Sequence, residues 1–501
     1  MRNVYYRIAV LMLALLFLQA GPVEAQQLRL RRDQKPVSSA QSLQGGKTVE
    51  VRERNVRAHM EFLASDALQG RGSGTQYELI AGQYIASQLR QFGIAPAGET
   101  DSSGQRLFLQ TVNMTRNSFA DAPKLSFSSA GKTIEWAHSK EIYVFQMNTA
   151  RASGPLQKMG VDGKPSAGAV LFIRLREGEN LQSLFQRVPE FFKQGVAAVL
   201  IEETPALRQR WSTKPPAFTS TSGSNAEMRN IIAVSSEAAR ALEQVADGTQ
   251  IEIKGRLNEA EAKNTWNVVG ELRGSDPRLS QEVILISAHM DHLGVRPSAP
   301  GDNIYNGADD DASGVTAVLE LARALGAGPR PKRTVYFVLF GSEEVGGHGA
   351  KYYIEHLPFK LEALAANLEF EMIGRPDAKV APDTLWLTGY ERSDLGPELA
   401  KHGARLVADP HPEERFFCRS DNYTLAVRGV VAHTVSSYGL HHEYHQPNDD
   451  LAHVDFAHMT KAINSMLEPV QWLVNAGFRP SWVAGKKPLG PSSDCEQAFN
   501  R

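Results

Sequence analysis

Cysteine and unbalanced charge are the two features that the sequence most nearly lacks. Only Cys418 and Cys495 occur among 501 residues, which excludes a cysteine-rich zinc site and a disulfide-dense scaffold. The two thiols can form one disulfide or stay unpaired, and the sequence leaves both alternatives open. The 54 Lys and Arg residues nearly balance the 56 Asp and Glu residues. Without a basic field to attract phosphates, we expect no nucleic-acid partner.

Long hydrophobic runs are also missing, apart from one at the N-terminus. Two arginines precede IAVLMLALLFLQ (residues 8–19), and the small-residue segment VEA (residues 23–25) follows it. This order is typical of a secretory signal peptide, here residues 1–25, with cleavage near Ala25. An apolar run of about twelve residues is too short to cross ~30 Å of hydrocarbon. We therefore expect export to the periplasm or the medium and no stable membrane span after cleavage, with an uncleaved anchor as the alternative.

Changes in composition and in the spacing of apolar residues divide the rest of the chain. After a polar leader, apolar residues recur at helical spacing, and a stretch of short apolar runs separated by Pro, Ser and Gly then predicts a small β-rich or mixed unit. Strand-like and helix-like stretches alternate beyond it. The expected segments after the signal peptide are a leader arm (26–48), the N-terminal part of the main domain (49–122), an inserted unit (123–262), the main part of that domain (263–480) and a C-terminal tail (481–501).

The alternating region predicts the fold class. Runs such as EVILISAHM, TVYFVLF and NLEFEMI are almost continuously apolar, as in strands that are covered on both faces. SGVTAVLELARAL between them has apolar residues at helical spacing. We predict an α/β fold, a three-layer sandwich around a mainly parallel mixed sheet, with its ligand crevice at the carboxyl ends of the strands.

Polar clusters follow several of these strand-like runs. Twelve of the fourteen histidines lie between residues 289 and 458, and acidic residues gather in the same window. Neither HExxH nor GxSxG occurs, which argues against a helical zinc motif and against the serine elbow of an α/β-hydrolase. The clusters are AHMDHLG (288–294), GADDDASG (307–314), GSEEVGG (341–347) and HHEYHQPNDD (441–450).

These motifs, in this order, resemble the co-catalytic di-zinc exopeptidase family, which includes secreted bacterial aminopeptidases and glutamate carboxypeptidase. The resemblance covers roughly residues 263–475 with specific motifs and extends weakly to the N-terminal helices. Residues 123–262 resemble the protease-associated domain that is often inserted in this family. The resemblance implies the zinc exopeptidase fold, two Zn²⁺ ions per chain and peptide substrates.

The resemblance also implies a set of metal ligands. His289 corresponds to the first zinc ligand, and Asp310, in the middle of GADDDASG, to the carboxylate that bridges both ions. Glu344 corresponds to a ligand of the second zinc and His445 to the other histidine ligand. Because the family has a cis peptide after the bridging aspartate, we expect one between Asp310 and Asp311.

Three further residues have implied roles in catalysis. Glu343 corresponds to the general base, which takes the proton of the attacking water and passes it to the leaving amine. Asp291 corresponds to the carboxylate that orients the imidazole of His289. Tyr444 falls where some members place a tyrosine that supports the transition-state oxyanion.

The remaining ligand is where this sequence departs from the family. The family usually reads Asn-Leu-Asp-Met-(Ile/Val)-Gly-Arg, whereas this chain reads NLEFEMIGR from residue 367. Alignment on MIGR places Glu371 at the aspartate position, and alignment on NL places Glu369 there. Strand alternation puts both on the same face, so geometry alone does not choose. We favour Glu371 because the Gly-Arg turn adjoins the site.

The function expected from these observations is that of an exported di-zinc aminopeptidase. A carboxypeptidase or dipeptidase on the same scaffold is one alternative, because the same metal centre hydrolyses either class of substrate. A non-catalytic, receptor-like relative is another, and such a protein should have lost metal ligands. Every ligand position here carries a competent residue, which favours an enzyme.

Overall fold

The computed structural model describes residues 49–147, 149–175, 181–204, 208, 218–221, 230–296 and 301–488. The expected signal peptide, the leader arm and Cys495 lie outside these residues. No helix of the described part is long and apolar enough to cross a membrane.

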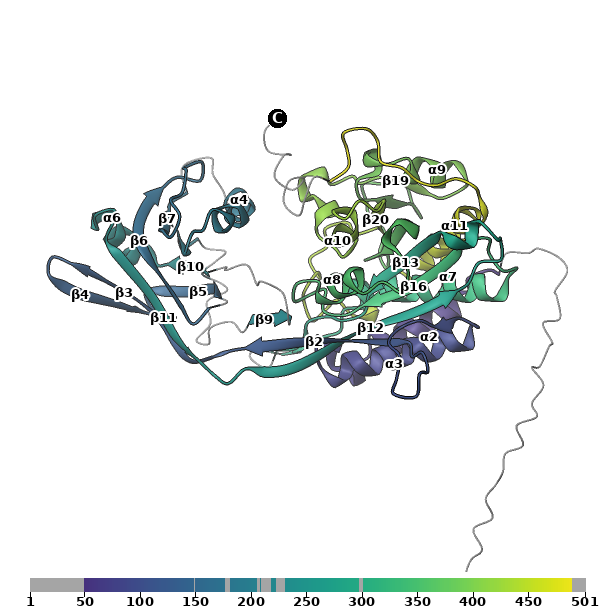
Figure 1. The fold of residues 1–501 in the computed structure, drawn as a ribbon, viewed down its shortest axis with the longest axis horizontal. Coiled ribbons are helices and arrows are strands. Elements are labelled where there is room, and N and C mark those ends of the chain that lie inside the picture. The colour runs from purple at the N-terminus through teal and green to yellow at the C-terminus, as the bar shows by residue number, and fades with distance from the viewer. Residues whose placement is uncertain are drawn as a thin grey trace, which may run out of the picture. The chain divides into compact units, whose positions relative to one another are not determined.

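A ten-stranded mixed sheet organises the larger α/β unit of the described chain (Figure 1). Its four central strands are parallel, and antiparallel strands extend the sheet on both sides. In spatial order the strands are β19 (Leu406–Ala408), β18 (Leu385–Leu387), β20 (Ala432–Ser436), β17 (Leu364–Phe370), β13 (Val283–His289), β16 (Thr334–Phe340), β12 (Glu261–Leu272), β2 (Leu109–Asn117) and β9 (Phe218–Thr221), and β1 (Ala95–Pro96) pairs with β12.

Helices cover both faces of this sheet, because its central strands are apolar on both sides. In β16, Val335, Phe337 and Leu339 join one hydrophobic core, and the alternate residues join another, as a period of two requires. The first core includes α2 (Glu53–Leu63), α3 (Gln76–Gln91), α7 (Gly314–Ala327), α9 (Leu395–Lys401) and α11 (Phe456–Asn475), and the second includes α8 (His348–Glu355) and α10 (Asn422–Ala426).

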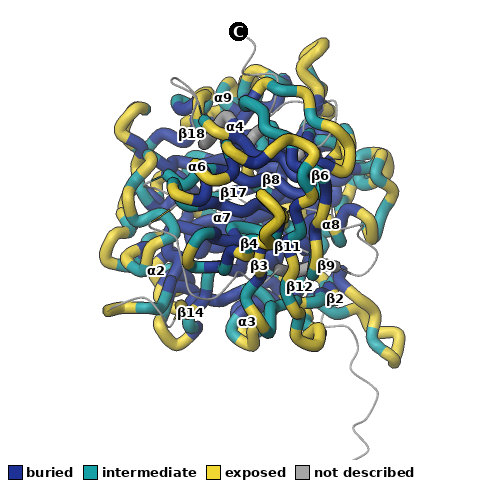
Figure 2. Tube along the Cα trace, turned by 90° about the vertical axis from the view of Figure 1, so that its left-hand side faces the viewer, coloured by how far each residue is buried: buried dark blue, intermediate teal, exposed yellow. Residues whose placement is uncertain are grey.

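The predicted three-layer α/β sandwich is thereby confirmed, and its parallel part is the centre of the sheet. Helix α7 has buried residues at nearly every position. Figure 2 accordingly draws β17 and α7 in the dark blue of buried residues. A short hairpin of β14 (Gly294–Val295) and β15 (Ile304–Tyr305) follows β13.

An eight-stranded sheet forms a second unit between residues 119 and 257. It has apolar cores of its own, and helices α4 (Leu181–Lys193) and α6 (Ser236–Gln244) accompany it. Its strands, in spatial order, are β4 (Lys132–Ala137), β3 (Phe119–Ser129), β11 (Gln250–Leu257), β6 (Arg151–Met159), β7 (Val170–Ile173), β8 (Ala198–Glu202), β10 (Asn230–Val234) and β5 (Ile142–Met147).

A buried arginine joins the last helix to the central sheet. Arg333, directly before β16, is fully buried. Its guanidinium donates to the carbonyl oxygens of Leu473 (2.8 Å) and Ala476 (2.5 Å) at the end of α11, and Nε donates to Glu282 Oε2 at 2.9 Å. A cation at a helix C-terminus satisfies carbonyls that have no partner within the helix.

Replacing this arginine should destabilise the fold measurably. We expect Arg333→Met to lower the free energy of unfolding by about 2–4 kcal/mol, because buried carbonyls and part of the Glu282 charge lose their partner. Thermal unfolding followed by circular dichroism measures the change. Lys461→Met is the matched control, since Lys461 makes an exposed ion pair with Asp383 and should cost less than about 1 kcal/mol. Equal melting temperatures for the two variants would contradict this account.

Candidate metal centre

The carboxyl ends of three neighbouring parallel strands supply most of the candidate site. His289 is the last residue of β13, Glu343 and Glu344 follow β16, and Glu371 follows β17 directly. Parallel strands that pair side by side end at the same edge of a sheet, so these side chains come together. Asp310 reaches the same place from the turn Ala308–Ser313 that leads into α7.

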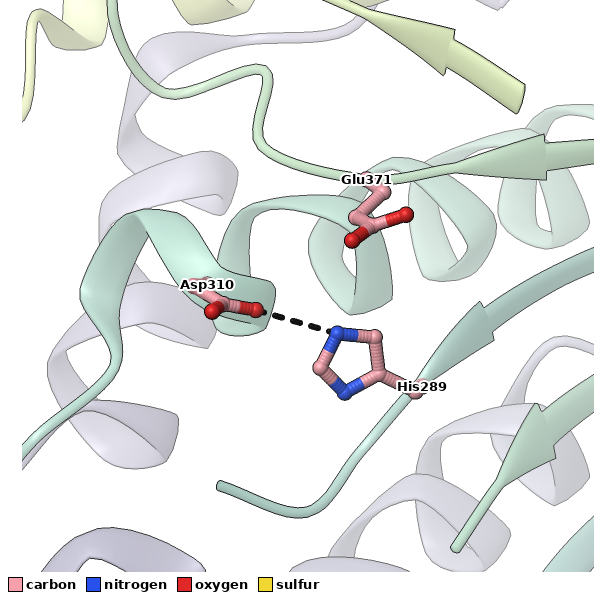
Figure 3. Close-up of side chains that lie close together, drawn as sticks. All are labelled: His289, Asp310 and Glu371. Carbon is pink, nitrogen blue, oxygen red and sulfur yellow. Dashed lines mark ion pairs between the residues drawn. The ribbon is translucent and has the colours of Figure 1, made fainter. Parts of the chain in front are cut away.

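The first group of candidate ligands consists of His289, Asp310 and Glu371. One nitrogen or oxygen atom from each lies within 4.8 Å of the others, and His289 Nε2 is 3.0 Å from Asp310 Oδ1. Figure 3 shows both carboxylates turned toward the imidazole. One nitrogen and two carboxylate oxygens form a donor set that suits Zn²⁺.

A second group uses the other oxygen of the same aspartate. His445 Nε2 lies 3.1 Å from Asp310 Oδ2 and 3.1 Å from Glu344 Oε2. Ligands held at 2.0–2.1 Å around a tetrahedral metal are about 3.3 Å apart, so these separations fit a common ion. Although burial opposes ionisation, contacts with His289 and His445 hold the pKa of Asp310 well below its usual value. The two oxygens of Asp310 thus face two separate groups of ligands.

His292 also belongs to this centre, although sequence reasoning gave it no role. Its Nδ1 lies 2.7 Å from Glu344 Oε1 and 3.8 Å from Asp310 Oδ2. It therefore contacts the Glu344 oxygen that His445 does not. The available signal was position alone, since His292 directly follows Asp291 in the strand-end motif AHMDHLG.

Buried nitrogen and oxygen atoms without well-oriented hydrogen bonds support a metal at this place. Both ring nitrogens of His289 and of His292, and Glu344 Oε1, are buried and make no hydrogen bond of good geometry within the described residues, although His289 Nε2 and His292 Nδ1 each lie close to a carboxylate oxygen. A buried polar group without a partner costs about 1–3 kcal/mol, and cations are the partners that imidazole nitrogens and carboxylates share. The residues present fit a metal centre.

Asp291 lies beside His289 and has further partners. Its Oδ1 is 3.8 Å from His289 Nδ1, which is beyond hydrogen-bond distance. The same oxygen accepts the backbone N–H of Glu343 at 3.0 Å, and Oδ2 accepts the hydroxyl of Ser73 at 2.5 Å. Asp291 therefore holds the turn after β16 to the Gly-rich loop of residues 69–75.

Glu343 lies beside the first group in a half-buried position. Burial raises the pKa of its carboxyl well above the usual value, and the charge of Asp421 adds to this while His289 opposes it. A carboxylate with a raised pKa is a stronger proton acceptor, which suits a general base near neutral pH.

Glu369 and Glu371, the two alternatives for the remaining ligand, have different surroundings in the structure. Glu369 is a buried residue of β17, and its Oε2 accepts the backbone N–H of Asn422. The strand ends at Phe370, so the alternation that placed Glu369 and Glu371 on one face stops before Glu371. Of the two carboxylates, Glu371 is the one grouped with His289 and Asp310.

Tyr444 packs against a candidate ligand. Its ring stacks on that of His445, with centroids 3.9 Å apart, and lies 5.3 Å from the ring of Tyr438. Burial and the charge of Asp310 raise the pKa of Tyr444. The phenol therefore stays protonated at neutral pH and can donate a hydrogen bond.

The three adjacent aspartates have different surroundings. Asp309 accepts the backbone N–H of Gly374 at 2.7 Å, and Asp311 accepts that of Gly314 at 2.9 Å. Only the middle residue, Asp310, faces both groups of ligands. The peptide bond between Asp310 and Asp311 is cis, which confirms that prediction.

Comparisons with known proteins bear on the same region. Residues 267–469 match the profile of Peptidase family M28. Among curated proteins, a probable leucine aminopeptidase 2 of Aspergillus oryzae is 27% identical over 210 residues, which are 40% of this chain and 39% of that protein. A probable lipoprotein aminopeptidase LpqL of Mycobacterium tuberculosis is 26% identical over 280 residues, 53% of this chain and 52% of that protein. The chain thus spans about half the length of these relatives, or less.

Solved structures share the fold at low sequence identity. An aminopeptidase from Aneurinibacillus sp. strain AM-1 superposes with a TM-score of 0.55 at 18% identity, covering 88% of this chain and 97% of that one. BSAP, a zinc aminopeptidase from Bacillus subtilis, gives a TM-score of 0.50 at 18% identity, covering 89% of this chain and 100% of that one. The four strand-end motifs, between residues 288 and 450, lie within residues 267–469, the part of the chain that matches the profile of Peptidase family M28.

Proposed function

We propose that this protein is an exported di-zinc aminopeptidase. The observation that carries the proposal is the placement of Asp310, whose Oδ1 faces His289 and whose Oδ2 faces His445. A carboxylate in that position can bridge two ions. With Asp310, His289 and Glu371 would hold one ion, and Glu344 and His445 would hold the other. The aminopeptidase relatives and the zinc aminopeptidase of the same fold support this choice of activity.

The residues around the centre supply the remaining chemistry. When bound, the zinc ions would polarise the scissile carbonyl and lower the pKa of a water molecule. Glu343 would accept the proton of the attacking water and deliver it to the leaving amine. Tyr444 donates its phenolic proton in a hydrogen bond to the oxyanion that develops. Asp291 keeps Glu343 in place through the backbone N–H of that residue.

The proposed domains have the boundaries that the sequence predicts. Residues 49–122 and 263–480 form the peptidase domain, and residues 123–262 form an inserted domain of the protease-associated type. Both groups of candidate ligands come from the peptidase domain, with His292 and His445 both beside Asp310 and Glu344 in the second group. A carboxypeptidase or dipeptidase is the alternative on this scaffold. Assays on aminoacyl, dipeptidyl and N-blocked substrates, with and without a chelator, distinguish these activities.

Replacement of Glu343 and replacement of Glu344 should impair the enzyme in different ways. Glu343→Gln keeps the size of the side chain but cannot accept a proton, so kcat on an aminoacyl substrate should fall by ~10²–10⁴-fold while both metals remain bound. Glu344→Gln should lose one metal, because a neutral amide is a poor zinc ligand, and excess zinc should partly restore its activity. Elemental analysis and kcat for both variants measure these effects. If Glu343→Gln loses metal and Glu344→Gln keeps it, the two roles are reversed.

The two histidines beside Glu344 provide a test of the second site. His445→Ala removes a proposed ligand and should leave one tightly bound zinc per chain. His292→Ala removes the residue that contacts the other oxygen of Glu344. It should weaken binding of the second zinc by about 10–100-fold, the usual effect of removing a residue that orients a metal ligand. Zinc titration monitored by calorimetry measures both. Stronger loss in His292→Ala than in His445→Ala would make His292 the ligand.

Export is part of the proposal and has its own test. The arginines, apolar run and small-residue exit within residues 1–25 are the basis for cleavage near Ala25. We expect N-terminal sequencing of the protein from the periplasm or medium to begin close to Gln26. Retention of Met1 in the exported protein would remove this part of the proposal.

A further inference from the structure

A small, partly open cavity adjoins the candidate metal centre and shares Glu371 and Tyr444 with it. Any residue whose peptide bond reaches the centre has this cavity beside it. The other lining residues are Met372, Trp386, Thr388, Phe416, Arg419, Thr434, Ser436 and Tyr438.

Aromatic and polar residues share the walls of this cavity, and two of its hydroxyl groups are already engaged. The hydroxyl of Thr434 donates to Asn422 Oδ1 at 3.0 Å. That of Ser436 donates to the carbonyl oxygen of Met372 at 3.1 Å. The stem of a bound side chain therefore meets apolar surface, and its specificity depends on the groups whose hydrogen bonds are unmet.

Two of the lining residues carry N–H donors that a ligand can use. The indole N–H of Trp386, which is 1% exposed, makes no hydrogen bond within the described residues. Arg419 is the only positively charged lining residue. Its Nη1 contacts Glu414 Oε2 at 3.2 Å and its guanidinium lies 4.9 Å from the ring centroid of Phe416. A guanidinium has five N–H groups in a fork that matches a carboxylate, so the contact with Glu414 leaves donors available.

The charges of the lining residues also favour a carboxylate ligand. Glu371 is the only acidic residue that lines it, and in the proposed function that carboxylate is neutralised by the metal. A bound carboxylate then faces the cation of Arg419 and a buried N–H donor, while its methylene groups lie against the aromatic rings. A basic side chain would meet repulsion from Arg419, and an uncharged apolar one would leave the Trp386 N–H without an acceptor.

We propose that this cavity receives the side-chain carboxylate of an N-terminal Glu or Asp residue and that Arg419 determines this specificity. The inference rests on the proposed function and names the substrate class that the site prefers. Arg419 acts on substrate selection, and its replacement should leave the hydrolysis of uncharged residues largely unchanged.

The test compares p-nitroanilides of Glu, Gln, Leu and Lys on the zinc-loaded full-length protein. The wild type should hydrolyse the Glu substrate with a kcat/KM at least about 10-fold above that of Gln. Arg419→Met should lower kcat/KM for Glu by about 10–100-fold, the effect of losing one charge-assisted hydrogen-bonded pair, and change the value for Leu by less than about 3-fold. Arg419→Glu should move the preference toward Lys.

Two further variants serve as controls. Arg428→Met removes an exposed arginine that pairs with Glu355 at 3.7 Å outside the cavity, and it should leave all four substrates unaffected. Trp386→Phe keeps a ring and removes the N–H, so it should lower kcat/KM for Glu more than for Leu. Because the Arg419 side chain is 42% exposed, its variants should fold normally, which melting temperatures check.

The outcomes separate this inference from the proposed function. Leu hydrolysis with no preference for Glu over Gln, or equal losses for Glu and Leu in Arg419→Met, would overturn the inference and leave the aminopeptidase intact. Slower hydrolysis of Leu-Gly but not of Leu-Gly amide in Arg419→Met would show that Arg419 binds a terminal carboxylate instead, which also overturns it. Absence of hydrolysis of every aminoacyl substrate by the zinc-loaded wild type would refute the function itself.

Discussion

The candidate centre can form only if the repulsion among the carboxylates at one edge of the sheet is offset. Asp309, Asp310 and Asp311 are adjacent in the chain and all are buried. The outer two carboxylates are satisfied by backbone N–H groups from the segments that follow β17 and begin α7. Asp449 uses its own two oxygens to accept the N–H groups of Asp309 and Asp310, at 2.9 and 3.0 Å. The surrounding backbone thus fixes this turn and leaves one carboxylate directed at the nitrogen ligands.

A buried arginine contributes to the same balance from the N-terminal part of the chain. Arg71 is fully buried, and its guanidinium donates to the carbonyl oxygens of Leu63, Met290, Asn306 and Gly307. Met290 directly follows the ligand candidate at the end of β13, and Gly307 begins the acidic turn. Burial lowers the pKa of Arg71, while the nearby aspartates oppose that shift. A guanidinium therefore stays charged there and connects two ligand-bearing segments.

The sequence supported the layers and strands better than it supported individual contacts. TVYFVLF was recognised because an apolar run bounded by polar residues marks a strand covered on both sides, and β16 spans that run. Periodicity also located α7. Glu369 and Glu371 could not be separated, because the choice depends on where β17 ends and on the N–H of Asn422, which comes from a distant segment. His292 and Arg71 were missed for a related reason, since their roles come from partners far away in the chain.

The long separation between Asp449 and the turn that it holds has a consequence for biosynthesis. Its carboxylate contacts Asp309 and Asp310 across 140 and 139 positions of sequence, and His445 comes from the same late segment. A chain still on the ribosome contains β13, β16 and β17 long before these residues emerge. The candidate centre cannot be completed until residues 445–449 have been made. The candidate centre therefore stays unfinished during most of the synthesis of this chain.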